Sequence, residues 1–571
     1  MDRRKLLEPV LMLILIIALL APRIPALDSF STLDEPYWLS MGANFYYALG
    51  QREFENTIYE YQPAVTTMWV VTFGMLFYYP EYRGLGQGYL EYEKGVLDPF
   101  MLDRGKDPLK LLEYSRLIQV FIIGLLFLVC YILLKRLVSK AAAFFTVLFA
   151  SFDPFFLGQS RLLDHEALLS LFVIASLASL AVYLSRGRKV IYLLLSGVMA
   201  GLAQLTKSSA LAMVLPAGLL FLIELIRDRR EGYLRAAGRH LGGFSLWMMV
   251  IAITYFVFWP GMWVAPGKML YEVYGNAFSY AFQGARLKVT GEVETSQLNL
   301  NANLGAARAL TTILLWRTTP WTWLGAILGF ILPFTRDPRH AHQQRQVFAL
   351  LLACGAAFIL LFGFAQGRDS PHYILASYLS LNLLGGLGWY ESISRIADRL
   401  HSLKPLQPLT LSLVVLVQVW SAISFYPYYY THRNPILQRA GWYKDFPQFA
   451  YGEGLELAAQ HLASLPGARD SVALVYYARG CFSYFFPGET TRFKPYYVDG
   501  DHQEDLLNSI RSADYIVVYY ATQGALEKYA KLIQTLSVVD PIHEVWLDGY
   551  KYVMVYQVAS LPESVFEILS R

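Results

Sequence analysis

Long apolar stretches recur through the first three quarters of the chain. A helix that crosses roughly 30 Å of hydrocarbon needs about 20 mostly apolar residues, and about eleven stretches approach that length. A chain of this kind can bury its apolar surface only within a bilayer, so the sequence predicts a mostly α polytopic membrane protein with about 11 transmembrane helices. The stretches lie near residues 6–24, 116–134, 141–157, 166–184, 190–206, 208–226, 241–259, 318–334, 347–365, 373–391 and 407–426.

The composition agrees with a membrane protein. Hydrophobic residues make up 55% of the chain and charged residues only 16%, whereas a soluble protein has about 25% charged residues. The net charge of +4 on 571 residues is too small to indicate nucleic-acid binding. The three cysteines have no metal-ligand spacing, and Cys130 and Cys354 lie in apolar stretches, which argues against a disulfide framework.

Basic clusters set the orientation of the spans. With the spans above, all the clusters fall on one side, which the positive-inside rule makes cytoplasmic. If the apolar segment 64–79 crossed the membrane, the later basic clusters would lie on the outer side. We therefore expect an interfacial or re-entrant helix there. The first apolar stretch also fits a cleavable signal peptide, but the many later spans favour an uncleaved helix. The clusters are Arg3 to Lys5, Lys135 to Lys140, Arg186 to Lys189, Arg227 to Arg239, Arg336 to Arg345 and Arg395 to Lys404.

The remaining segments then face outward. They are the loops 25–115 and 260–317, the turns at 158–165, Lys207 and 367–372, and the tail after about residue 427. Alternating strand and helix patterns in the tail predict a small extracytoplasmic α/β domain. We therefore expect two domains, a membrane domain over 1–430 and an α/β domain over 431–571. Strands are expected at 472–478, 515–520 and 550–558, with helices at 503–511 and 524–536.

Acidic residues stand at two outward ends of membrane helices. Asp34 and Glu35 follow the first span, although Asp34 before Glu35-Pro36 also fits an ordinary helix N-cap. Ionisable side chains at membrane depth are costly unless they are paired or face water, so they indicate function. A second group comprises Arg161, Asp164, His165 and Glu166. Its last three residues could bind a divalent metal, although adjacent helical positions point in different directions, which argues against a metal site there.

Cations gather on the same side of the membrane. Lys207 lies between Thr206 and Ser208 at an outward turn, where a snorkelling lysine is the ordinary alternative to a phosphate ligand. Arg116 opens the second span. Arginine binds phosphate through a planar fork, and His and Tyr can donate beside it. The turn at 367–372 and the next residue add Arg368, His372 and Tyr373.

These features together resemble the GT-C glycosyltransferases, specifically family 39, the protein O-mannosyltransferases and the related lipid A aminoarabinose transferases. Asp34-Glu35 looks like the acidic motif of the family's first loop. Residues 59–64 resemble its His-Pro-Pro stretch, although Gln62 and Ala64 depart from it, which argues against the mannosyltransferase branch itself. The likeness covers roughly residues 1–430. Arg116-Leu117, Arg161 to Asp164, Leu205 to Lys207 and the exit at Tyr426 to Tyr429 follow in family-like order.

The resemblance implies a polyprenyl-phosphate-linked sugar, hexosyl or pentosyl, as donor and inversion at the anomeric carbon. The acceptor would be a hydroxyl of a protein, lipid or glycan, reached at a cavity open to the outer leaflet of the cytoplasmic (inner) membrane. Asp34 matches the expected general base, with Glu35 and Asp164 holding the acceptor or orienting cations. No certain cofactor is implied. We expect the donor phosphate at Arg116, Lys207, Arg368, His372 and Tyr373, and further cavity residues at Gln62, Arg161, His165 and Glu166.

Other functions fit a multi-span protein. A transporter or flippase of a lipid-linked substrate also buries charges, but the sequence shows no repeated halves, and its charges gather at one face instead of mid-membrane. A scaffolding protein would leave the outward acids and cations unexplained. A third alternative, within the enzyme class, is an oligosaccharyl-type or ligase-type relative that uses a metal. Transfer of a lipid-linked sugar is the function that we expect.

Overall fold

The computed structural model describes residues 3–58, 62–85, 97–228, 232–277, 300–331, 338–364, 370–441, 451–475, 480–492, 503–520 and 530–570. The chain forms two compact units. We call Met1–Pro25, Gly42–Gly88 and Ser115–Trp442 the membrane unit, and Ala26–Met41, Tyr89–Tyr114 and Tyr443–Arg571 the sheet unit. Two pieces of the first loop thus group with the tail. The predicted division into a catalytic domain over 1–430 and an α/β domain over 431–571 stays a prediction.

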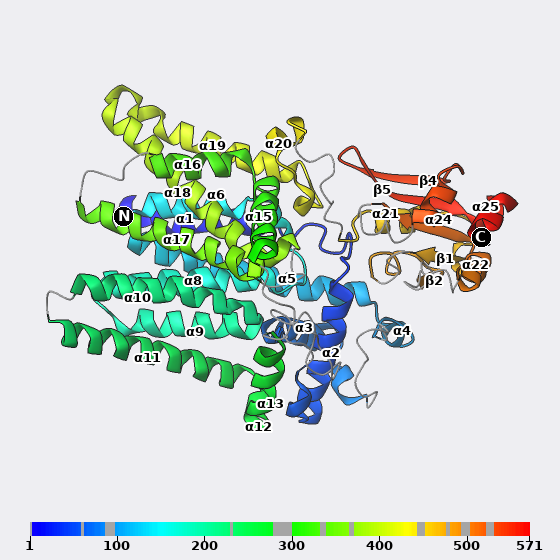
Figure 1. The fold of residues 1–571 in the computed structure, drawn as a ribbon, viewed down its shortest axis with the longest axis horizontal. Coiled ribbons are helices and arrows are strands. Elements are labelled where there is room, and N and C mark those ends of the chain that lie inside the picture. Colours follow the sequence, from blue (N-terminus) through cyan, green and yellow to red (C-terminus); the bar gives the residue numbers. More distant parts are fainter. Residues whose placement is uncertain are drawn as a thin grey trace. The chain divides into compact units, whose positions relative to one another are not determined.

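The membrane unit is built of helices, many of them long (Figure 1). The later residues of α2 (Glu35–Gln51) and α5 (Pro108–Leu137) belong to it. Its other helices are α1 (Arg3–Leu20), α3 (Val65–Tyr78), α6 (Lys140–Ser151), α7 (Pro154–Gln159), α8 (Glu166–Ser185), α9 (Val190–Thr206), α10 (Val214–Asp228), α11 (Tyr233–Phe258), α12 (Gly261–Val264), α13 (Pro266–Leu270), α15 (Leu300–Arg317), α16 (Pro320–Ile331), α17 (Pro338–Phe364), α18 (Leu375–Arg399), α19 (Gln407–Ile423) and α20 (Pro435–Arg439).

Six helices of the described residues are long and apolar enough to cross a membrane, and five shorter ones are also apolar. The predicted polytopic helical fold is confirmed, whereas the count of eleven spans stays a prediction, as does the re-entrant role of the segment that forms α3. The apolar window of α8 is fully buried, but that of α19 is only 11% buried. Since α8 is apolar on every side and buried, it forms the centre of the unit. Helix α19 exposes most of its apolar side chains, which suits contact with lipid.

Helices α16 and α18 pack closely because glycines line their contact. A Cβ on Gly388 would overlap the carbonyl oxygen of Gly325, and a Cβ on Gly325 would overlap that of Gly385. Thr322 Oγ1 also donates to Asn382 Oδ1 across the same pair at 2.6 Å. Small residues and interhelical hydrogen bonds hold helices together where lipid removes the hydrophobic drive.

Gly388→Leu is expected to lower the thermal unfolding temperature of the purified protein. The added side chain must push α16 away from α18, and overpacking of this kind costs about 1–3 kcal/mol or more. Gly218→Leu on α10 is the matched control, because a Cβ there meets no atom within 4 Å. Equal unfolding temperatures for the two variants, followed by intrinsic fluorescence in detergent, would contradict the packing described here.

The sheet unit carries a five-stranded sheet in the order β2-β1-β3-β5-β4. Strand β1 runs parallel to β2 and β3, while β5 runs antiparallel to β3 and β4. The predicted strands correspond to β1, β3 and β5, and the predicted helices to α22 and the described part of the second one, α24. The elements are α4 (Leu97–Leu102), α21 (Leu455–Ala463), β1 (Val472–Val475), β2 (Glu489–Arg492), α22 (Gln503–Arg511), β3 (Tyr515–Tyr519), α24 (Ala530–Leu536), β4 (His543–Leu547), β5 (Tyr550–Gln557) and α25 (Glu563–Ser570).

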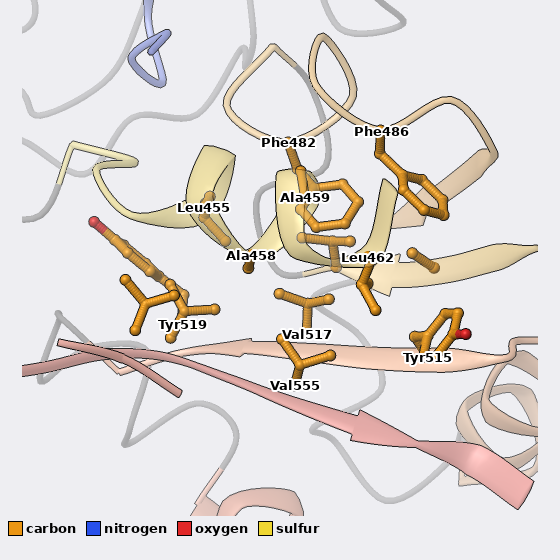
Figure 2. Packing of buried hydrophobic residues seen from close by; sticks show 14 of the residues in the cluster. Leu455, Ala458, Ala459, Leu462, Phe482, Phe486, Tyr515, Val517, Tyr519 and Val555 are labelled. Carbon is orange, nitrogen blue, oxygen red and sulfur yellow. The ribbon is translucent and has the colours of Figure 1, made fainter. Parts of the chain in front are cut away.

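The central strands are buried on both faces. Figure 2 shows α21 laid over one face, with Leu462 above Val517 and Val555. On the other face Ile516 and Val518 pack with residues of α22, α24 and α25. This double burial explains the nearly continuous apolar run of β3. The segment that leads into α21 is therefore fixed to the sheet.

Candidate active site

Lys207 stands at a break between two helical segments. Helix α9 ends at Thr206, Lys207 is extended, and the 3₁₀ turn Ser208–Met213 follows. Its Nζ donates to Oε1 of Glu166, the first residue of α8. The two side chains are only 4% and 1% exposed. A buried ion pair therefore joins the beginning of α8 to the end of α9.

Asp164 and His165 extend this pair into a cluster. The His165 backbone N–H donates to Asp164 Oδ1 at 2.6 Å, and its Nε2 lies 3.6 Å from Glu166 Oε1. Burial lowers the pKa of His165 well below its usual value, and Lys207 and His372 lower it further. Burial and then Lys207 lower the pKa of His372 to about 3. Both imidazoles are therefore neutral, and the positive charge of the cluster is that of Lys207.

Aromatic rings cover the lysine. Lys207 Nζ lies 4.3 Å from the ring centroid of Tyr373 and 5.8 Å from that of Phe362. The two rings stack at 5.3 Å, and His372 meets Tyr373 at 4.5 Å. Cation–π attraction of this kind is strongest where water is excluded. The turn Pro371–Ile374 and helix α17 thus complete a wall around the amine.

The first loop contributes to the same place. Ala64 N–H donates to the Thr206 carbonyl at 3.2 Å, and Thr66 Oγ1 lies 2.8 Å from Thr206 Oγ1. Gln62, two residues before Ala64, is half-buried. The segment that resembled the family's His-Pro-Pro stretch therefore lies against the Lys207 turn. Its first three residues, 59–61, lie outside the described residues.

The Arg161 guanidinium binds backbone carbonyl oxygens. It donates to those of Arg23 at 3.1 Å, Pro427 at 3.1 Å and Pro25. The guanidinium thus ties the end of the first helix to the chain after α19. Arg116 is buried and close enough to Arg161 to act on it electrostatically. Arg368 lies outside the described residues.

The predicted acidic pair belongs to the sheet unit, where its two members differ. Glu35 is 1% exposed, and its Oε2 accepts the N–H and the hydroxyl of Thr32, each at 2.8 Å. This carboxylate holds the beginning of α2. Asp34 is half-buried, and its Oδ2 accepts a hydrogen bond from the Tyr451 hydroxyl at 2.6 Å. Asp34 is the better placed of the two to act on another molecule.

Among the described residues, no three His, Cys, Asp or Glu side chains are placed to hold a metal ion. Asp164, His165 and Glu166 are among those residues. His165 lies between the two carboxylates, with Nδ1 3.1 Å from Asp164 Oδ1 and Nε2 3.6 Å from Glu166 Oε1.

Two residues beside the predicted site residues, Phe362 and Tyr451, were not predicted from the sequence. Phe362 lies inside an ordinary apolar stretch, so nothing in the sequence marks it. Tyr451 precedes Gly452 and Gly454, which both have positive φ. That glycine pattern signals a constrained loop, and could have drawn attention to its neighbours.

Residues 112–259 match a family model described as dolichyl-phosphate-mannose-protein mannosyltransferase. The matched segment contains α8, α9 and the Lys207–Glu166 pair. This match covers about a quarter of the chain, and it supports the GT-C glycosyltransferase class that we propose below for the whole chain. No curated protein matches this sequence.

The chain is also similar to solved structures. One is ArnT from Cupriavidus metallidurans bound to undecaprenyl phosphate, at 14% identity and a TM-score of 0.47, covering 95% of this chain and 97% of that one. Another is the archaeal oligosaccharyltransferase AglB from Archaeoglobus fulgidus, at 12% identity and a TM-score of 0.40, covering 96% and 72%. Both TM-scores lie below 0.5, so the assignment to the class depends on the family match.

Arg161→Ala is expected to lower the thermal unfolding temperature. The variant leaves the buried Arg23 carbonyl without this donor, which costs about 1–3 kcal/mol, and it also removes the partly buried bonds to Pro427 and Pro25. Arg239→Ala is the control, because Arg239 pairs with Asp228 at 3.1 Å from a side chain that is 41% exposed. Calorimetry in detergent decides the matter. An unchanged unfolding temperature for Arg161→Ala would show that those bonds do not stabilise the fold.

Proposed function

We propose that this enzyme transfers a sugar, hexosyl or pentosyl, from a polyprenyl phosphate to a hydroxyl of a protein, lipid or glycan, with inversion at the anomeric carbon. The family whose model matches is described by a donor of this kind, dolichyl-phosphate-mannose. The single observation that carries the proposal is the buried Lys207–Glu166 pair under its aromatic wall. We place the reaction on the extracytoplasmic side of the cytoplasmic membrane, because the basic clusters between the predicted spans fall on the opposite side.

Stability alone does not explain the buried Lys207–Glu166 ion pair. Removing two charges from water costs several kcal/mol per ion, and apolar side chains of similar volume often stabilise a fold equally well. An ammonium held ready by a carboxylate suits an anion that arrives and leaves. We infer that the donor phosphate takes Lys207 Nζ from Glu166 while its isoprenoid tail remains in lipid. His372 and Tyr373 line the same place and complete the phosphate site.

The chemistry follows from these groups. The acceptor oxygen attacks the anomeric carbon on the side opposite the phosphate, and its proton passes to the Asp34 carboxylate. The bond between the anomeric carbon and the phosphate oxygen breaks, and the electron pair leaves with the polyprenyl phosphate. Negative charge grows on that oxygen, so a fixed cation such as Lys207 favours the transition state. Arg116 and Arg368 stay proposed phosphate ligands. Asp164 and Glu35 stay proposed positioning groups, and Gln62, Arg161, His165 and Glu166 stay proposed cavity residues.

Asp34→Asn is expected to abolish transfer, because an amide cannot accept the acceptor's proton. Mass spectrometry of envelope glycans, lipids and glycoproteins compares a strain that lacks the protein with strains restored by the wild type or the variant. The modification should return only with the wild type. Undecaprenyl phosphate should bind the purified variant and the wild type equally, which shows that the fold is intact. Full restoration by Asp34→Asn would remove Asp34 as the base.

Lys207→Met is expected to raise the Kd for undecaprenyl phosphate by roughly tenfold or more, since a charge-assisted bond contributes about 1.5–3 kcal/mol. Glu166→Gln is the matched variant: it breaks the same ion pair but keeps the ammonium, so its Kd should stay equal or fall. Native mass spectrometry in detergent measures both. If both variants weaken binding to the same degree, the pair has only a structural role.

A further inference from the structure

Within the sheet unit, one tyrosine far along the chain meets the proposed base. Tyr451 lies 417 positions after Asp34, and its hydroxyl donates to Asp34 Oδ2 at 2.6 Å. The Tyr451 side chain is only 3% exposed. The Leu33 N–H, next to Asp34, donates to the Tyr451 carbonyl at 3.0 Å. Two bonds therefore fix the two segments to each other at this point.

The sheet holds Tyr451 in place. The Gly452 N–H donates to the hydroxyl of Tyr519 on β3 at 3.1 Å. Gly452 has φ +101°, and a Cβ there would overlap Sγ of Cys481, so glycine alone fits. The Tyr451 N–H donates to Glu453 Oε2 at 2.7 Å. The hydroxyl of Tyr451 is thus aimed by a backbone that the sheet core supports.

Acidic groups surround this hydrogen bond. Cys481 is near enough to Asp34, Glu35, Glu453 and Glu456 for all four to raise its pKa, after the larger effect of burial. Glu35, Glu453 and Glu456 are at most 1% exposed. Neighbouring carboxylates favour the protonated form of an acid, whereas a hydrogen bond donated to the carboxylate favours the charged form. Further titratable groups of this region are Tyr519, whose hydroxyl meets the Gly452 N–H, and Tyr484, which donates to Asp98 Oδ1 at 3.0 Å.

We propose that Tyr451 is a positioning residue for catalysis, whose hydroxyl orients the Asp34 carboxylate and keeps it ionised among its acidic neighbours. The sheet unit, which contains Asp34, then also supplies the hydroxyl that orients this carboxylate. The proposal depends on the function proposed above, because it takes Asp34 as the base. The phenol itself stays protonated, and the acceptor's proton goes to Asp34.

Tyr451→Phe tests the proposal, because it removes one oxygen and keeps the ring. The pKa of Asp34 should rise without the donated bond, and the base works only above that pKa. The acidic limb of kcat/KM should therefore move to higher pH by about one unit, the size expected from one hydrogen bond to a charged group. On the plateau above that limb, kcat should fall several-fold while the donor KM stays unchanged. The full-length enzyme is assayed by release of undecaprenyl phosphate from radiolabelled undecaprenyl-phosphate hexoses and pentoses.

Tyr484→Phe is the matched control, since it removes a hydroxyl that donates to a different carboxylate of the same unit. Its acidic limb should match the wild type. If Asp34→Asn is inactive but Tyr451→Phe keeps the wild-type limb and kcat, the role of Tyr451 is overturned while the proposed base stands. If Asp34→Asn is active, Asp34 is not the base and the role of Tyr451 falls with it. If the wild type releases no undecaprenyl phosphate from any of these donors, the proposed function itself fails. Equal unfolding temperatures for Tyr451→Phe and Tyr484→Phe ensure that a lost fold is not mistaken for a lost hydrogen bond.

Discussion

The membrane unit is organised around a lysine that is buried with its counter-ion. An ammonium in an apolar interior must be paired, and Glu166 meets that need at the first turn of α8. Helix α8 is apolar on every side and therefore central, and the side chain of its first residue, Glu166, is buried with the helix. Tyr373 and Phe362 close over the amine. The site thus follows from how the unit packs.

The sheet unit solves a different electrostatic problem. It gathers several carboxylates, most of them buried, and leaves Asp34 half-buried with one tyrosine hydroxyl on its carboxylate. A hydrogen bond donated to a carboxylate favours its charged form, so the Tyr451 hydroxyl favours the ionised Asp34 that the proposed base requires.

Sequence alone predicted the membrane fold well, because apolar length is a local property. It also selected Lys207, Glu166, His165 and His372, since the expected topology put them on one side. It could not pair Lys207 with Glu166, because a contact between separate helices depends on packing. The same limit hid Tyr451, which comes near Asp34 only after the sheet has formed.

Other differences have equally plain causes. Asp34 and Glu35 look alike in the sequence, and only the hydrogen bonds from Thr32 assign Glu35 to the beginning of α2. Arg161 was predicted to be a cavity residue, and its donors bind backbone carbonyls of the segments that follow α1 and α19. Strand β2, which reads Glu489-Thr490-Thr491-Arg492, was missed because it has no apolar side chain to mark it.

A cryo-electron microscopy structure of the enzyme in lipid nanodiscs with undecaprenyl phosphate tests the central claim most directly. The account predicts phosphate density within hydrogen-bond distance of Lys207 Nζ, beside Tyr373 and His372, with the isoprenoid chain leading into lipid. Phosphate density elsewhere, with the Lys207 amine still on Glu166, would contradict it.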